Sequence, residues 1–228
     1  MATQPSNSPW TTSADGARLA CSALGGQIDL RSGGLNAITI NGVPITGRLW
    51  DLGAGADGQP LQAAIEHYAR GDDFVSVHPP SQSFPFRTQL VWSVETLDAA
   101  PRCVLLTLTL SLQTDLLDTR PAIVLSSDLA RQSQPEYRKT AIGRWVGYGD
   151  LDSGATWCCY EMVHPLDQGE TQIIEDDRPS LRIEPPFLEK GVIRSCRAAA
   201  AFFSGDPSEE ELAAVRGAFI HAELPLTA

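Results

Sequence analysis

Residues 102–113 read Arg-Cys-Val-Leu-Leu-Thr-Leu-Thr-Leu-Ser-Leu-Gln, and this stretch indicates the fold class. Every second residue from 104 to 112 is valine or leucine. In an extended chain successive side chains point to opposite faces, so these residues form one apolar face while Thr107, Thr109 and Ser111 lie on the other. A helix would scatter the same leucines around its circumference. The stretch therefore predicts a β-strand with one buried face.

Similar alternation, or short apolar runs between turn residues, recurs along the chain. It predicts further strands at 19–24, 27–30, 35–40, 74–78, 87–95, 122–126, 156–164 and 192–203. The stretch 61–70 fits a helix or a strand, and its context favours a strand.

One helix is predicted near the C-terminus. Asp206-Pro207-Ser208-Glu209 supplies an N-cap at Asp206, a proline at the first helical position and an acidic side chain in the first turn. Gly217 is placed to end this helix, and 219–224 is predicted to return as a strand. The chain is therefore expected to be all-β, with a large antiparallel β-sandwich and one short C-terminal helix.

Domain organisation follows from length and local composition. The 228 residues suit one large domain. Residues 1–15 are rich in Ser, Thr, Pro and Asn, and we predict a disordered tail there, with Trp10 able to fold back. Residues 16–228 are predicted to form a single β-sandwich domain.

The charge balance limits the classes of partner. Lys and Arg number 17 against 28 Asp and Glu, which gives a net charge of −11 and a pI near 4.7. Phosphate backbones bind to clustered basic residues, so nucleic acid is not expected as a partner. The sequence has no apolar run long enough for a membrane span and no secretion signal at its start, which predicts a cytoplasmic protein without a membrane partner. Its oligomeric state is left open.

Several motifs touch on metals and cofactors. Five cysteines at irregular spacing predict reduced thiols rather than a disulfide framework or a zinc site. The glycines of 53–58 match the dinucleotide fingerprint but are not followed by a helix, so a surface loop is expected. Asp150 and Asp152, with Glu161 at the twelfth position, partly match a calcium loop, although the sixth position is not glycine. We predict no cofactor and leave calcium open.

Polar and aromatic side chains on strand faces are the remaining candidates for chemistry. Tyr160 and His164 share a face of the strand 156–164, where the histidine could exchange a proton and the tyrosine could stack on a ligand. The alternative is that both are structural residues of the core. Tyr68, Arg70 and Arg87 are candidate binding residues, although charges that point off a sheet are usually only solvated.

Two further segments bear a family resemblance. Met162-Val163-His164-Pro165-Leu166-Asp167 and Phe187-Leu188-Glu189-Lys190-Gly191-Val192-Ile193-Arg194 resemble the galactose mutarotase-like superfamily. This resemblance implies a β-supersandwich fold. It also implies that a histidine and a glutamate act as acid and base when a sugar ring opens and closes. His164 would be that histidine, and either Glu184 or Glu189 the glutamate.

Two function classes follow. The first is a protein that recognises a carbohydrate, either an aldose epimerase or a relative that has lost the activity. The second is a β-sandwich module that binds another protein and performs no chemistry. If a sugar binds, Tyr160, His164, Arg70 and Arg87 should face one concave surface.

Overall fold

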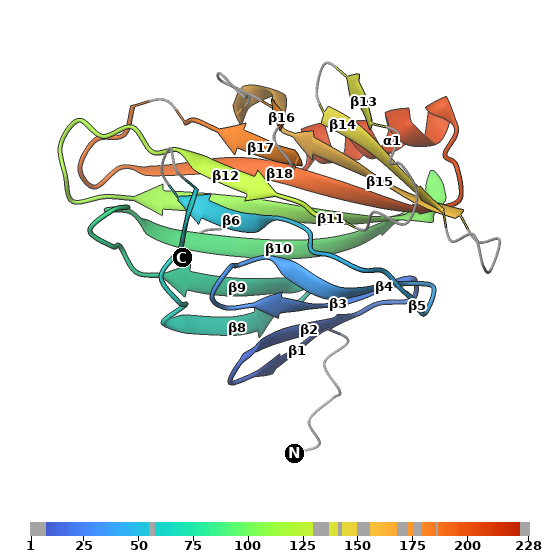
Figure 1. The fold of residues 1–228 in the computed structure, drawn as a ribbon, viewed down its shortest axis with the longest axis horizontal. Helices are drawn as coiled ribbons and strands as arrows, with labels where there is room; N and C mark the ends of the chain where they lie inside the picture. Colours follow the sequence, from blue (N-terminus) through green and yellow to red (C-terminus); the bar gives the residue numbers. More distant parts are fainter. Residues whose placement is uncertain are drawn as a thin grey trace.

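The computed structural model describes residues 8–54, 58–129, 137–140, 143–149, 156–167, 173–175, 179–185 and 187–223. An eight-stranded sheet forms the largest layer, and the predicted strand of 102–113 lies inside it as β11 (Figure 1). The strand order is β13-β14-β15-β18-β11-β10-β9-β8, and every neighbouring pair is antiparallel. The bounds are β8 (Glu66–Arg70), β9 (Asp73–His78), β10 (Arg87–Leu97), β11 (Ala100–Gln113), β13 (Tyr137–Thr140), β14 (Gly143–Gly149), β15 (Thr156–Val163) and β18 (Ile193–Ser204).

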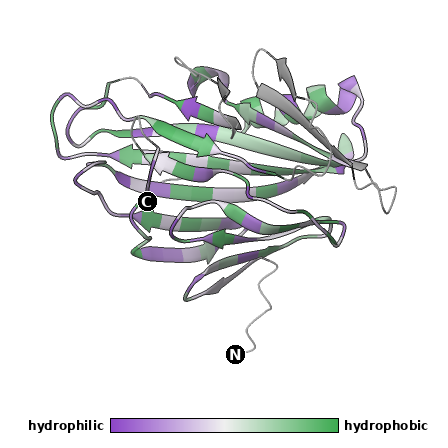
Figure 2. Ribbon diagram, viewed as in Figure 1, coloured by the Kyte–Doolittle hydropathy of each residue, from purple (hydrophilic) through white to green (hydrophobic). Residues whose placement is uncertain are grey.

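The alternating leucines of β11 are buried as predicted. Val104, Leu106, Leu108, Leu110 and Leu112 are all nearly inaccessible to solvent and belong to the main core. Figure 2 shows hydrophobic bands along the strands of this sheet. The strand is central because β10 pairs along one edge and β18 along the other.

Two five-stranded sheets cover the face of the large sheet that carries these leucines (Figure 1). The first has the order β1-β2-β3-β4-β5, and the second has the order β16-β17-β12-β6-β7. Their strands are β1 (Trp10–Ser13), β2 (Gly16–Ala20), β3 (Leu24–Asp29), β4 (Leu35–Ile40), β5 (Val43–Pro44), β6 (Asp51–Ala54), β7 (Gln59–Pro60), β12 (Ile123–Ser126), β16 (Ile173–Glu175) and β17 (Pro179–Ile183). The protein is therefore an all-β antiparallel sandwich, as the sequence predicted.

On the opposite face of the large sheet, the helix α1 (Glu209–His221) covers the region of β11, β15 and β18 (Figure 1). Val215 and Phe219 of the helix form a second core with side chains such as Tyr160, Ala199 and Phe203. Ala199 and Ala201 of β18 are small, fully buried side chains of this second core. The C-terminal helix is therefore confirmed.

Two details of the predicted helix are wrong. The N-cap is Ser208, and the helix continues through Gly217 as far as His221, so no strand begins at 219. Val215 and Phe219 are four residues apart and lie on one face of a helix, where both are buried. Burial of Phe219 favours continuation of the helix past the glycine.

The N-terminal segment is ordered earlier than predicted. β1 pairs with β2, and the Trp10 side chain is only 4% exposed. Its indole Nε1 donates to the carbonyl oxygen of Asp72 at 2.9 Å, and its ring lies 5.7 Å from that of Phe74. The prediction of disorder is therefore wrong for residues 10–13, because the tryptophan buries its ring against the sandwich.

Candidate functional site

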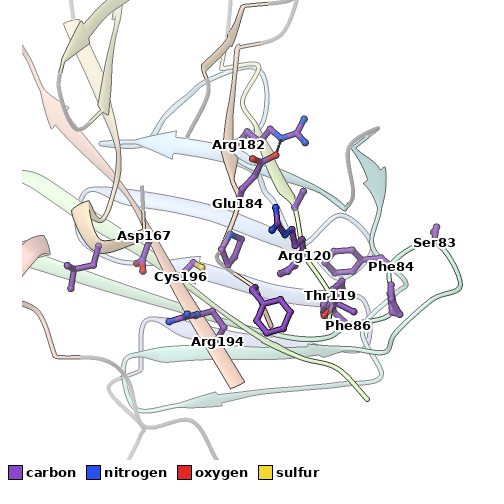
Figure 3. A pocket seen from close by; sticks show the side chains of 16 residues that line it. Ser83, Phe84, Phe86, Thr119, Arg120, Asp167, Arg182, Glu184, Arg194 and Cys196 are labelled. Atoms are coloured by element: carbon purple, nitrogen blue, oxygen red, sulfur yellow. Dashed lines mark hydrogen bonds and ion pairs between the residues drawn. The ribbon is translucent and has the colours of Figure 1, made fainter. Parts of the chain in front are cut away.

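A pocket of about 970 Å³ is formed where several connecting segments meet (Figure 3). They are residues 83–86 before β10, residues 119–122 between β11 and β12, the 3₁₀ turn η1 (Pro165–Asp167), four residues at and beyond the end of β17 (Arg182, Glu184, Pro185 and Phe187), and Arg194 and Cys196 near the start of β18. These segments are distant in the sequence. The pocket is therefore a product of the tertiary fold.

Backbone pairing holds two of these segments together. The N–H of Leu188 donates to the carbonyl oxygen of Thr119 at 2.9 Å, and the N–H of Thr119 donates back to Leu188 at 3.2 Å. The Thr119 hydroxyl also donates to the Leu188 carbonyl oxygen at 3.0 Å, while the Leu188 side chain is fully buried. Residues next to this bridge, among them Arg120 and Phe187, are thereby held at the pocket.

Aromatic rings supply an apolar part of the pocket wall. The rings of Phe84 and Phe86 lie 4.7 Å apart at an interplanar angle of 52°. The N–H of Phe84 donates to the Ser81 hydroxyl oxygen at 3.0 Å, which supports the turn that carries them. Phe187 also lines the pocket and remains 43% exposed. The pocket can therefore contact a flat apolar surface of a ligand.

Charged side chains supply the polar part. Arg182 Nε donates to Glu184 Oε1 at 2.5 Å, so these two side chains pair with each other. Asp167 Oδ2 accepts from the backbone N–H of Arg197 at 2.9 Å. Within the described parts of the chain, Arg120 and Arg194 have no hydrogen-bond or ion-pair partner. Figure 3 shows both of these arginines at the pocket.

The structure places His164 outside the pocket. Its ring is 3% exposed and lies edge-on to Phe219, with 5.6 Å between the ring centres. The Nε2 atom lies 3.1 Å from the carbonyl oxygen of Ile220 and 2.9 Å from Nη2 of Arg197, while the N–H of Leu166 donates to Nδ1 at 3.2 Å. These contacts tie η1 to the end of α1. The role of His164 as a proton carrier stays a prediction.

Tyr160 is not part of the pocket wall either. It is buried in the second core with Phe219, on the face of β15 that α1 covers. Side chains alternate along this strand, so Cys159 and Glu161 point into the sandwich while Tyr160 and Met162 point toward the helix. The expected meeting of Tyr160, His164, Arg70 and Arg87 on one concave surface is not found.

The other predicted site residues are spread over the surface. Tyr68 and Arg70 lie on the edge strand β8, where Arg70 Nη2 is 3.6 Å from Asp73 Oδ2. Arg87 is exposed at the start of β10, and Glu189 is exposed beyond β17. Glu184 is the predicted site residue that lines the pocket.

Sequence reasoning did not select Phe84, Phe86, Arg120 or Arg182 for the site. A usable signal was present, because proline stands beside phenylalanine or arginine at Pro85, Pro121 and Pro185-Pro186. Prolines restrict the backbone and often hold a surface loop in one shape. The sequence does not, however, predict that these proline-containing segments meet at one pocket.

The calcium motif can be judged only in part. Asp150 and Asp152 lie outside the described residues. Glu161 is fully buried between the sheets, where Oε2 accepts from Trp50 Nε1 at 2.8 Å and from the Ser127 hydroxyl at 3.1 Å. The described residues contain no group of three or more His, Cys, Asp or Glu side chains placed for a metal ion.

Comparisons with known proteins concern the fold. No family model matches the chain, and none of the curated proteins matches it. The periplasmic domain of Thermotoga maritima YidC is similar over 86% of this chain and 87% of that domain, with 10% identity and a TM-score of 0.45. A protein of the human microbiome described as a kojibiose phosphorylase is similar over 93% of this chain, with 10% identity and a TM-score of 0.46. This chain spans 27% of that protein. Among the described residues, no helix is long and apolar enough to cross a membrane.

Proposed function

We propose that this protein recognises a carbohydrate in the pocket, as a β-sandwich of the galactose mutarotase-like type. The observation that carries the proposal is the combination of Phe84, Phe86 and Phe187 with arginine and carboxylate side chains in one pocket. A sugar ring presents C–H groups on its faces and hydroxyl groups around its edge. Aromatic rings pack against the former, and charged side chains form hydrogen bonds with the latter.

The size of the pocket agrees with such a ligand. Small-molecule sites usually have volumes of about 300 to 1,000 Å³. The volume of about 970 Å³ is at the upper end of this range, so the pocket has room for a monosaccharide and for a further ring.

Acid–base chemistry on the sugar would require carboxyl groups that touch it. Glu184 and Asp167 line the pocket, and each is oriented by an arginine, Arg182 and Arg197 respectively. A ring-opening step needs one group to remove a proton and another to supply one. Glu184 is therefore the residue to substitute when the protein is tested for exchange of sugar anomers.

The test of recognition is calorimetric titration with a panel of reducing sugars. We expect binding by the parent and about fivefold weaker binding by Phe187→Ala, because an aromatic contact contributes roughly 1 kcal/mol. Leu117→Ala is a matched control, since Leu117 is apolar, 75% exposed and not part of the pocket wall. Failure of every sugar to bind, or equal binding by parent and Phe187→Ala, would contradict the proposal.

Anomer exchange is measured separately by NMR on each sugar that binds. If the protein is an epimerase, the parent accelerates exchange and Glu184→Gln reduces the acceleration by about 100-fold or more. Binding without acceleration would identify the inactive relative. Acceleration that survives in Glu184→Gln would remove Glu184 from the reaction.

The second candidate function is a protein-interaction module. Leu116, Leu117, Val192 and Ile193 are exposed apolar residues on the two segments that the Thr119–Leu188 bridge joins. Exposed apolar residues that gather in one place often mark an interaction surface. Sedimentation of the parent and of Leu117→Ser tests self-association through this surface. If the parent sediments only as a monomer, a second copy of the chain is excluded as the partner.

A further inference from the structure

We propose that the carbohydrate is an acidic one, whose oxyanion is bound by the guanidinium groups of Arg120 and Arg194. This inference rests on the proposed function and deepens it. The charge of the pocket specifies which class of sugar it binds.

Some of the positively charged side chains in the pocket have no negatively charged partner among the described residues. Arg182 and Glu184 are paired, and Asp167 is engaged by Arg197, whose Nε lies 3.7 Å from Oδ2. Arg120 and Arg194 have no hydrogen-bond or ion-pair partner among the described residues. The pocket therefore presents two guanidinium groups whose charge is not matched by a carboxylate of the described residues.

Each arginine lies in or next to a segment whose backbone is paired with another part of the chain. Arg194 stands opposite Leu112 in the pairing of β18 with β11, and it shares a strand face with Cys196, which also lines the pocket. Arg120 follows Thr119, whose backbone and hydroxyl both bond to Leu188. Two separate elements thus bring the guanidinium groups to one pocket (Figure 3).

Such a local cationic site is unusual for this chain, whose net charge is −11. Excess acidic side chains were available to pair with these arginines, yet none lies within ion-pair distance in the described structure. A guanidinium group matches a carboxylate or a phosphate with two parallel N–H donors, and such charge-assisted hydrogen bonds are stronger than those to a hydroxyl. An acidic sugar therefore uses groups that a neutral sugar would leave unmatched.

The experiment compares matched sugars by calorimetric titration of the full chain. The pairs are glucose with glucuronate and galactose with galacturonate, and glucose 6-phosphate separates a phosphate from a carboxylate as the preferred oxyanion. We expect at least one acidic sugar to bind about tenfold or more tightly than its neutral counterpart in about 50 mM salt. This preference should shrink in about 300 mM salt, which screens exposed charges.

Arg120→Gln and Arg194→Gln should each reduce the preference for the acidic sugar by about tenfold, the value of one charge-assisted hydrogen bond. Arg216→Gln is the matched control, because Arg216 is exposed on α1 and outside the pocket. It should keep the full preference.

The outcomes separate this inference from the proposed function. Neutral sugars that bind as tightly as acidic ones would overturn the inference and leave carbohydrate recognition in place. A preference that survives in both arginine variants would also overturn it. Binding of none of these sugars, and of none in the wider panel, would overturn both.

Discussion

His78 is a buried polar side chain that obtains its partners from its own strand and from a neighbouring segment. Its Nδ1 atom lies 2.8 Å from the carbonyl oxygen of Gln62, and its Nε2 atom lies 3.2 Å from the hydroxyl oxygen of Ser76. The side chain is 1% exposed. Burial lowers the pKa of the imidazole from its ordinary value of 6.5, and the hydrogen bond to Gln62 partly opposes this. The neutral ring is therefore the form that the fold favours.

This predicts a stability that depends on pH. The contribution of His78 is fully present above pH 6.5 and is lost as the pH falls below that value, because the unfolded chain then binds the proton more readily. The loss approaches about 1.4 kcal/mol per pH unit until the folded pKa is reached. Urea unfolding of the parent and of His78→Gln from about pH 8 to about pH 5 measures this. Equal slopes for the two proteins would show that His78 does not cause the dependence.

At the scale of one element, α1 shows how local sequence signals start a helix. Ser208 Oγ accepts from the N–H of Glu211 at 3.2 Å, and the N–H of Ser208 donates to Glu211 Oε2 at 2.9 Å. This reciprocal pair is a capping box. Arg102 of β11 donates to the same carboxylate at 2.7 Å and holds the pKa of Glu211 at about 2, with the Ser208 N–H contributing further. The first turn of the helix is thus held by its own capping box and by an ion pair with the sheet.

Ser208→Ala should therefore reduce the free energy of unfolding by about 1 kcal/mol, since the cap no longer accepts the N–H of Glu211. In a chain of this length that corresponds to a decrease in Tm of about 2–4 °C. Thermal unfolding at neutral pH measures the change. Ser208→Asp is the control, because aspartate also caps helices and should stay close to the parent. A large decrease in both variants would point to a cause other than capping.

At the scale of the whole molecule, the middle of the large sheet (β11, β15 and β18) is buried on both faces, and cysteines lie on each. Cys159 and Cys196 belong to the core between the sheets, whereas Cys103 and Cys158 belong to the core under α1. Burial raises the pKa values of Cys103, Cys158 and Cys196 to about 12, with small effects from nearby charges. The thiolate is the reactive form of cysteine, so buried thiols with raised pKa values react slowly.

We therefore predict that a thiol reagent at about pH 8 modifies no more than one cysteine of the native protein quickly. That residue is Cys21, which is partly exposed, whereas the other four cysteines are buried. In denaturant, all five cysteines should react quickly. Fast modification of the native Cys21→Ser variant would show that one of the sheet faces is open to solvent.

The sequence by itself determined the strand β11 and the all-β class. Alternation of leucines with polar residues is a local pattern, and only an extended strand gathers those leucines on one face. The capping signals near residue 208 likewise predicted a helix. Its end was wrong, because the decisive contact joins Phe219 to side chains of distant strands.

Only the tertiary structure decided the site. Alternation shows that Tyr160 and Glu161 point to opposite faces, but it does not say which face α1 covers. The pocket collects Phe84, Arg120, Glu184 and Arg194 from segments that are separated in the chain. Their meeting depends on the register of β18 with β11 and on the backbone bridge from Thr119 to Leu188. These are long-range pairings, and no local pattern specifies which two segments will form them.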